Sequence, residues 1–331
     1  MNVENRTATA TWYCIQETIL EIEQYYIPVF MCLSLLGNSL SVYVIFRSKL
    51  RYFSSSIYLS ALAISDTGVL VTIIISWLIT HVTKQENWAT VFRICIENFF
   101  AFLSVWLVVT FTVERYVAIK WPLLHRSFCT IARAKIVVIV LTGIAALFTI
   151  PWFEFFFSID IHTLYKDDTK MTYKDDNTTS DSYSEDKNNM RSDSMLRIMD
   201  MSIMFALPLI MIVIFNTLIV CNIYKQNHVQ KDLSIASVTS SEQIQIASNE
   251  TQIRITKMLI LISSTFICLN TPVYICWFIT DYHITNRPIW LDVAWNLSDL
   301  LWMTNYGINF VFYYLSGHNF RKALIRLFTK C

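Results

Sequence analysis

The chain has 331 residues, of which 54% are hydrophobic and only 15% are charged, and its formal net charge at pH 7 is +1. The apolar residues gather in seven long stretches rather than in the alternating patterns of a soluble core. This distribution argues against a soluble globular domain, which would have to hold seven helices that are apolar on every side.

Each of the seven stretches carries few or no charged residues. In chain order they cover residues 25–46, 57–80, 92–117, 136–157, 201–224, 258–280 and 290–315. About 20 apolar residues in a helix cross a hydrocarbon core that is about 30 Å thick. We therefore predict an all-α membrane protein in which residues 25–315 form a seven-transmembrane helix bundle.

Basic residues predict the orientation of this bundle. They follow the first stretch, precede the fourth and follow the seventh, and they are Arg47, Lys49, Arg51, Arg126, Arg133, Lys135, Arg321, Lys322, Arg326 and Lys330. Short cytoplasmic loops are enriched in Lys and Arg, so we expect these segments and the C-terminus on the cytoplasmic side. Residues 1–24 then form an extracellular N-terminus, which lacks the apolar core of a cleavable signal peptide. We predict a multi-pass protein of the plasma membrane.

Two longer segments between the stretches are polar. Residues 159–200 contain ten acidic and six basic residues, and 158–200 is predicted to be a long acidic extracellular loop that cannot fold alone. The Ser-, Thr- and Gln-rich residues 225–252 are predicted to be a cytoplasmic loop. Sequons at Asn5 and Asn177 fall on the predicted outer side, where we expect glycosylation.

One polar line follows the third stretch. Glu97, Ser104 and Arg115 are seven and eleven residues apart, close to whole numbers of helical turns. In lipid such a line must face the interior of the bundle. We expect it to join a site at the outer end to one at the inner mouth.

Further polar side chains lie within other stretches. Asp66 is in the second stretch, and Asn305 and Asn309 share one face of the seventh. Their oxygen atoms favour either a site for a hard cation or a purely structural hydrogen-bond cluster, and both interpretations stay open. Pro208 and Pro272 remove backbone hydrogen bonds and are expected to kink the fifth and sixth helices.

Short motifs along the seven stretches have the order and spacing of one known family. They are Asn38 after Gly37, Leu62-Ala63-Ile64-Ser65-Asp66, Glu114-Arg115-Tyr116 followed by Trp121-Pro122-Leu123, Pro208, Phe266 six residues before Pro272, and Asn309 four residues before Tyr313. With these motifs the chain resembles the rhodopsin-like (class A) G-protein-coupled receptors. Residues 316–331 are similar to the short amphipathic eighth helix of that family and a short cytoplasmic tail, in which Cys331 is a candidate for palmitoylation.

The resemblance implies partners and roles for matched residues. Those implied to couple to a heterotrimeric G protein are Glu114, Arg115, Tyr116 and Tyr313. Those implied to hold an allosteric sodium ion are Asp66, Ser104, Asn305 and Asn309. Arrestin and membrane lipid are further implied partners, whereas no other cofactor and no nucleic acid are expected. A narrower similarity, carried by Asn309-Phe310 and Tyr313 with Leu315-Ser316-Gly317, is to peptide receptors, in particular invertebrate receptors of the FMRFamide and myosuppressin type.

The chain also departs from the family pattern. Asn270 replaces a tryptophan two residues before Pro272, Phe310 replaces a proline after Asn309, and Asn216 replaces a tyrosine. How these departures alter switching stays open. The two cysteines that usually join the third helix to the long outer loop are both absent, and a bond between Cys14 and Cys95 is as compatible with the sequence as two free thiols.

Acidic and aromatic residues surround the outer half of the predicted bundle. The residues predicted to contact a ligand are Glu97, Asp200, Asn270, Tyr274, Trp277, Asp281, Trp295 and Asp299. Carboxylates attract cations and can hold an arginine by two hydrogen bonds. Asp281 also matches an aspartate of RFamide-like peptide receptors. We predict a receptor for an extracellular cationic neuropeptide that activates a G protein.

Three alternatives are weighed against that prediction. A receptor for a biogenic amine or another small molecule shares the fold, and Glu97 lies where amine receptors carry an aspartate. An ion or proton transporter would use the buried acids as its pathway, but no broken paired repeats are visible. An enzyme is disfavoured because no phosphate-binding loop, metal-ligand spacing or nucleophile triad appears.

Overall fold

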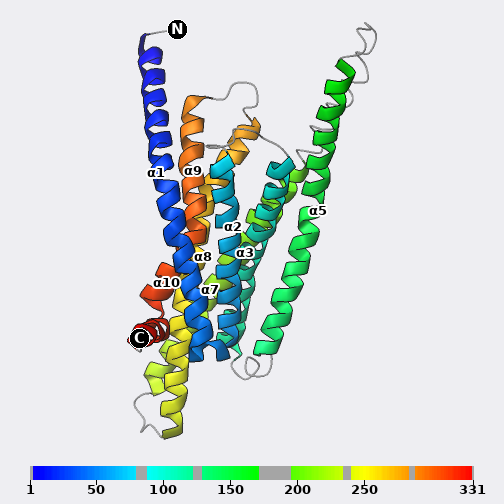
Figure 1. The fold of residues 1–331 in the computed structure, drawn as a ribbon. Helices are drawn as coiled ribbons and strands as arrows, with labels where there is room; N and C mark the ends of the chain where they lie inside the picture. The colour runs from blue at the N-terminus through cyan, green and yellow to red at the C-terminus, as the bar shows by residue number, and fades with distance from the viewer. Residues whose placement is uncertain are drawn as a thin grey trace.

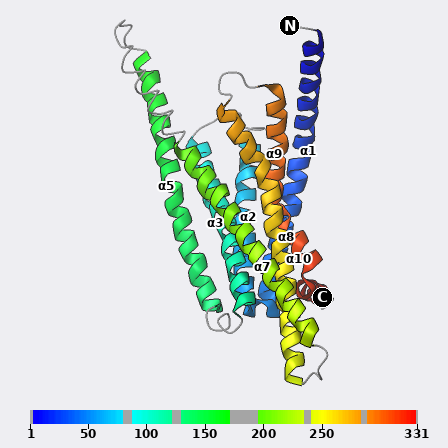
Figure 2. The same ribbon diagram turned by 180° about the vertical axis from the view of Figure 1, so that it is seen from behind.

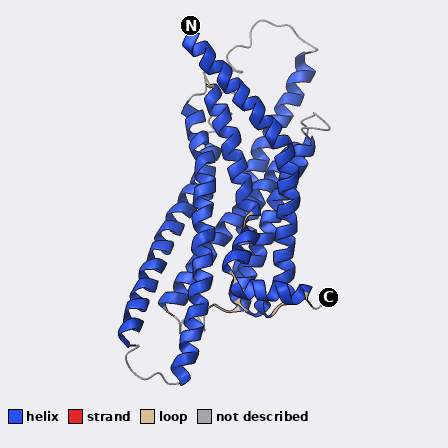
Figure 3. Ribbon diagram, turned by 90° about the vertical axis from the view of Figure 1, so that its left-hand side faces the viewer, coloured by secondary structure: helices blue, strands red, loops and turns tan. Residues whose placement is uncertain are grey.

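The computed structural model describes the backbone of residues 3–79, 88–121, 129–170, 195–233, 240–282 and 288–329. Within these ranges the chain is almost entirely helical and contains no β-strand (Figures 1 and 3). The long helices are α1 (Val3–Arg47), α2 (Ser54–Leu78), α3 (Trp88–Lys120), α5 (Ile131–Lys170), α7 (Leu207–Leu233), α8 (Ser240–Tyr282) and α9 (Ile289–Gly307). Four shorter elements are η1 (Lys49–Tyr52), the π-helix η3 (Met201–Ala206), α10 (Asn309–Ser316) and α11 (His318–Phe328).

The long helices form one bundle with the two termini at opposite ends (Figures 1 and 2). Helix α1 packs on α2 and α9, and α9 packs on α8. Helix α3 lies at the centre, because it contacts α2, α5, α7 and α8. Helix α11 crosses the other helices at the end that holds the C-terminus (Figure 3). A side chain on α3 can therefore reach most of the bundle interior.

Six helices among the described residues are long and apolar enough to cross a membrane. They include α1, α2, α3, α5 and α8, together with the segment Met195–Lys225 that contains η3 and most of α7. The seventh crossing is α9 followed by α10, which Asp292, Asp299 and a break at Ile308 make shorter and more polar. Large apolar side chains such as Leu36, Ile139 and Leu147 point outward, as expected of a surface in contact with lipid.

Several helices continue past the predicted spans. Helix α1 begins at Val3 instead of residue 25, α5 continues to Lys170, and α7 and α8 enter the predicted cytoplasmic loop. Apolar length marks where a helix meets lipid, whereas helical hydrogen bonds continue into water wherever the local sequence permits. Residues 171–194 of the predicted acidic loop, including Asn177, lie outside the described ranges, as does the side chain of Asn5.

Proline and glycine shape the helices near the core. The π-helix η3 ends two residues before Pro208, where the backbone lacks one donor. In α8, Asn270 and Thr271 donate side-chain hydrogen bonds to the carbonyls of Phe266 and Ile267, one turn before Pro272. At the end of α9, a Cβ atom on Gly307 would lie 2.1 Å from the hydroxyl of Ser34, so only glycine lets α1 approach so closely.

Candidate functional site

A cavity of about 360 Å³ lies between α3, α8 and α9, in the half of the bundle nearer the N-terminus. Its lining includes seven of the eight side chains predicted to contact a ligand, and these are Glu97, Asp200, Asn270, Tyr274, Trp277, Trp295 and Asp299. The side chain of the eighth, Asp281, lies outside the described residues. Four separate helical segments thus bring the predicted set into one space.

The three acids of the cavity differ in their partners. Glu97 forms an ion pair with Arg93, one turn earlier on α3. Asp200 and Asp299 form no ion pair with any residue in the described ranges, and Oδ1 of Asp200 is buried there without a hydrogen-bond partner. Both residues are half-buried, and a carboxylate that is partly removed from water is costly unless a cation or a donor compensates it. Asp200 and Asp299 therefore favour a cationic guest.

Aromatic rings supply the walls of the same cavity. Tyr274 stacks on Phe205 at a centroid distance of 4.4 Å, and Trp277 stacks on Trp295 at 5.9 Å. Asn270 adds an amide at the cavity wall while its Nδ2 donates to the carbonyl of Phe266 at 2.7 Å. Aromatic faces attract cations and bury the apolar part of a guest.

A second polar cluster lies deeper, where α2, α3 and the α9–α10 junction meet. Oδ1 of Asp66 accepts from the hydroxyl of Ser104 at 2.6 Å, and Oδ2 accepts from the amide of Asn309 at 2.6 Å. Asn305 is buried one turn before Asn309 but is not among the side chains that donate to Asp66. Asp66 is completely buried, so the cluster connects three helices through one carboxylate.

The chemistry of this cluster fits a small hard cation. Carboxylate, hydroxyl and amide oxygens are the ligands that alkali and alkaline-earth ions prefer. Asp66 and Ser104 already lie within hydrogen-bond distance of each other, and the charge of Asp66 has no ion-pair partner in the described part of the chain. Asp66 and Ser104 would hold a sodium ion, with the amide oxygens of Asn305 and Asn309 as further ligands.

The third cluster is at the opposite end of α3, around Arg115. Nη2 of Arg115 donates to Oε1 of Glu114 at 2.8 Å, and the hydroxyl of Ser54 donates to the same oxygen at 2.6 Å. The guanidinium also lies 5.3 Å from the centroid of the Phe111 ring. Arg115 is only 1% exposed, so these contacts hold its charge inside the bundle rather than at the surface.

Residues near Arg115 connect it to the fifth and sixth crossings. Tyr116 packs against Phe215 of α7 at a centroid distance of 5.4 Å. One residue further, Asn216 donates to the hydroxyl of Ser263 in α8 at 2.6 Å. The asparagine that departs from the family pattern thus forms a direct polar link between α7 and α8.

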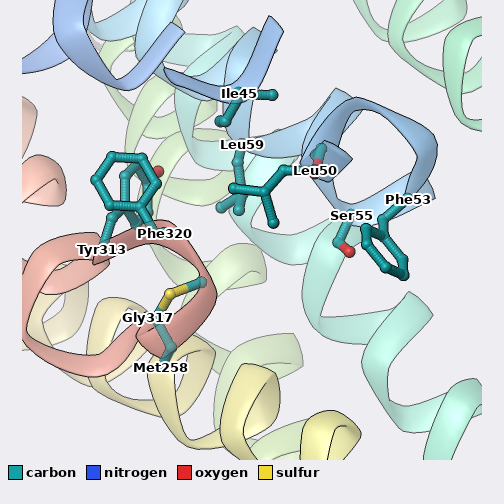
Figure 4. Close-up of a pocket in the computed structure, with 10 residues that line it drawn as sticks. Ile45, Leu50, Phe53, Ser55, Leu59, Met258, Tyr313, Gly317 and Phe320 are labelled. Carbon is teal, nitrogen blue, oxygen red and sulfur yellow. The ribbon is translucent and has the colours of Figure 1, made fainter. Parts of the chain in front are cut away.

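Tyr313 lines a small apolar pocket of about 80 Å³ at the same end of the bundle (Figure 4). Tyr313, Gly317 and Phe320 lie on one side of this pocket, and Leu50 and Phe53 lie across from them. The Tyr313 hydroxyl is buried and has no hydrogen-bond partner among the described residues. The pocket separates η1 from the junction of α10 and α11.

Sequence reasoning missed two side chains that change the electrostatics. Arg93 neutralises Glu97, and its spacing of four residues on one helix is a signal that could have been used. Ser54 binds Glu114 from 60 residues away, and no local pattern indicates that contact. Cys14 and Cys95 are both free thiols, and Cys331 lies outside the described residues.

An all-helical membrane bundle with a cavity near one end, a buried carboxylate at its centre and a buried arginine near the other has the layout of a transmembrane receptor. The family model described as "7 transmembrane receptor (rhodopsin family)" matches residues 37–313, and the chain belongs to this family. The predicted fold class, a seven-helix bundle with a short C-terminal helix, is therefore confirmed. Because the family consists of receptors, the prediction that the chain is not an enzyme is confirmed as well.

Within this family, the chain is similar to several receptors that are named for their ligands. The chain is 26% identical to a thyrotropin-releasing hormone receptor of Gallus gallus over 89% of its own length and 75% of the relative. It is 24% identical to an FMRFamide receptor of Drosophila melanogaster over 90% of its length and 52% of the relative. A neuromedin-U receptor 1 of Mus musculus is 33% identical over 35% of the chain and 28% of the relative. The predicted similarity to peptide receptors, including FMRFamide receptors, is confirmed.

Proposed function

We propose that this chain is a plasma-membrane receptor that binds an extracellular cationic neuropeptide and activates a heterotrimeric G protein. The observation that carries the proposal is the cavity in which Asp200 and Asp299, without ion-pair partners among the described residues, lie beside stacked aromatic rings. An arginine side chain fits that environment, because its planar guanidinium pairs with carboxylates and stacks on aromatic faces.

The relatives support a peptide as the ligand. The FMRFamide receptor and the thyrotropin-releasing hormone receptor are named for ligands that are peptides. A cavity of about 360 Å³ accommodates the end of a short peptide rather than a whole folded hormone. We therefore propose that one arginine and a neighbouring apolar or aromatic residue of the peptide occupy the cavity, and that Asp281 is a further contact of the peptide.

A biogenic amine is the second candidate, and one observation weakens it. An amine would need Glu97 as its counter-ion, but Glu97 already pairs with Arg93. Displacing Arg93 would leave a second, half-buried cation to be compensated. A transporter is disfavoured further, because hydrogen bonds from Ser104 and Asn309 on two other helices hold both oxygens of the central carboxylate Asp66.

Signal transfer is proposed to follow α3. Ligand in the cavity contacts α3, α8 and α9, and α3 also carries Ser104 and Arg115. A ligand that binds one arrangement of these helices better than another shifts the population between them. In the active arrangement we propose that Arg115 leaves Glu114 and contacts the G protein, with Tyr116 and Tyr313 beside it.

A bound sodium ion would stabilise the inactive arrangement. Asp66, Ser104, Asn305 and Asn309 would hold it, and it would supply the positive charge that buried Asp66 lacks in the described structure. Agonist and ion would then bind different arrangements of the helices, so each would weaken the other by the same factor.

The proposed orientation places the N-terminus outside and the C-terminus in the cytoplasm. It is supported by Arg47, Lys49, Arg321 and Lys322, which lie at the end of the bundle opposite the ligand cavity. Glycosylation at Asn5 and Asn177, palmitoylation at Cys331 and binding of arrestin complete the proposal.

The test is a ligand screen on cells that express the full chain. Short amidated peptides with and without arginine, and a panel of biogenic amines, would be scored by calcium and cyclic AMP. We expect an arginine-containing peptide to act at the lowest concentration. Activation by an amine at nanomolar concentration, with no peptide active below micromolar concentration, would overturn the peptide assignment.

A further inference from the structure

A basic groove of about 540 Å³ lies at the end of the bundle opposite the ligand cavity, between η1 and α11. Arg47 and Lys49 line one side, and Lys322 and Arg326 line the other. All four side chains are exposed, and none forms an ion pair with a described residue. Two segments that are about 270 residues apart in the chain therefore present four positive charges to one space.

No acidic residue is near the groove in the sequence. Residues 24–65 and 300–331 contain neither Asp nor Glu. Basic loops on the cytoplasmic side are common in membrane proteins, and by themselves they indicate only orientation. The present case is different because the charges converge on a groove instead of being spread over the surface.

Two further arginines in the same segments lie outside the groove. Nη2 of Arg51 donates to the hydroxyl of Tyr52 at 2.6 Å, and its guanidinium lies 4.8 Å from the centroid of that ring. Arg321 follows Phe320 on α11 and is not part of the groove lining. Four basic residues of these segments therefore line the groove, whereas Arg51 and Arg321 do not.

Apolar side chains form part of the groove wall. Leu50, Phe53 and Leu327 lie among the four charges, and Leu50 and Phe53 also line the apolar pocket of Figure 4. Ser48 holds η1 in place by accepting a hydrogen bond from the backbone of Leu50 at 3.2 Å. Ile325 of α11 is 57% exposed, as expected of a helix that lies in a membrane interface. The groove combines charge with apolar surface, which suits a lipid headgroup with its acyl chains.

We propose that this groove binds the headgroup of a polyanionic, phosphorylated inner-leaflet phospholipid of the phosphoinositide type. Phosphate groups accept hydrogen bonds from both Arg and Lys, and several phosphates on one headgroup match four cations in one groove. A lipid with a single negative charge leaves most of them uncompensated. A lipid also brings acyl chains to the apolar walls, which a soluble anion does not. The site lies about the length of the bundle away from the ligand cavity, so it is distinct from the proposed peptide site.

The test uses the purified full chain in nanodiscs of neutral phosphatidylcholine without agonist. Binding of phosphatidylinositol 4,5-bisphosphate is measured by native mass spectrometry and by its effect on the melting temperature. The groove variant is Arg47→Gln with Arg326→Gln. The matched control is Arg51→Gln with Arg321→Gln, which removes the same charge from the same two segments. A second groove variant, Lys49→Gln with Lys322→Gln, serves if the first fails to fold.

A hydrogen bond to a charged group contributes about tenfold in affinity, so the groove variant, which removes two charged donors, is expected to bind about 100-fold more weakly. The control is expected to stay within about twofold of the unmodified chain. Phosphatidylserine at equal total charge and soluble inositol trisphosphate are expected to bind more weakly than the phosphoinositide.

Three results would overturn the proposal. Equal loss in groove variant and control would show diffuse attraction to the surface. Equal binding of phosphatidylserine would show that multiple phosphates are not selected. Binding of soluble inositol trisphosphate as tight as that of the lipid would identify a free anion site. The assay contains no agonist and no G protein. Its result therefore does not depend on whether the receptor's ligand is a peptide.

Discussion

The two ends of α3 differ in whether the charged side chains around them are paired. Around Glu97, the cavity holds Asp200 and Asp299 without ion-pair partners in the described part of the chain. Around Arg115, the guanidinium is buried against Glu114 and Phe111, and Ser54 supports Glu114. The outer end therefore lacks a counter-charge that a ligand can bring, whereas the inner end is closed by contacts that must break before Arg115 can reach a partner. This difference fits the proposed switch between a resting and an active arrangement.

Loss of the inner charge is expected to have the largest effect. Arg115→Ala removes the positive charge of the inner cluster, which we propose pairs with the G protein, and agonist-stimulated signalling is expected to fall to background. Surface expression, measured by flow cytometry of a tagged receptor, is expected to stay near normal. Lys120→Ala, an exposed residue of the same helix, is the control. Normal signalling per receptor in Arg115→Ala would break the assignment of the inner end.

Loss of one outer charge is expected to have the next largest effect. Asp299→Asn removes a carboxylate with little change of shape, and loss of one partner of a desolvated pair costs about 2 to 5 kcal/mol. The potency of an arginine-containing peptide is expected to fall about 30-fold or more in a dose–response assay. Glu21→Gln, an exposed acid on α1, is the control. A peptide with lysine in place of arginine is expected to lose potency on the unmodified receptor but little on Asp299→Asn. If the arginine-containing peptide is equally potent on Asp299→Asn and on Glu21→Gln, the arginine does not bind Asp299.

Asp66 lies between the two ends of α3, so a change at this residue tests whether the centre of the bundle couples them. If it holds a sodium ion in the resting arrangement, sodium is expected to weaken agonist affinity by about fivefold or more. Asp66→Asn is expected to abolish this dependence in a radioligand binding assay. Replacement of sodium by a bulky organic cation at constant ionic strength is the control for screening. An equal effect of both cations on the unmodified receptor would contradict ion binding at this cluster.

The smallest effect is expected for the two cysteines near the outer end. Cys14 and Cys95 are free thiols in the structure, and Cys95 is buried in α3. Cys14→Ser and Cys95→Ser are each expected to leave peptide binding within about twofold of the unmodified receptor. Binding would be measured with and without a reducing agent. A severe loss in both single variants, with no further loss in the double variant, would indicate that the two thiols are bonded in cells.

Periodicity along α3 was enough to predict which of its residues meet the interior. Glu97, Ser104 and Arg115 lie in the outer cavity, the Asp66 cluster and the inner cluster, as their spacing indicates. The position of acidic and aromatic residues near the outer ends of the other stretches extended this prediction to the six remaining cavity residues. Their roles in binding stay predictions.

Other features have no local signal in the sequence. The contact of Ser54 with Glu114 depends on how α2 packs against α3, and the link between Asn216 and Ser263 depends on how α7 packs against α8. Helix ends were also unpredictable, since α1 continues outward to Val3 through residues that carry no apolar run. Such features arise from tertiary packing and from backbone hydrogen bonding, which a pattern of apolar residues does not encode.

The π-helical segment Met201–Ala206 determines which way the residues before it face. A π turn accommodates one more residue than an α turn, so the segment shifts the register of everything that precedes it by one residue, or about 100° of rotation. Asp200 directly precedes the segment and lines the cavity. Deletion of Ser202 would restore an α-helical pitch and turn Asp200 away from the cavity without removing a side chain that lines it. The charge of the cavity therefore depends on the π-helical backbone of this segment as well as on the identity of its residues.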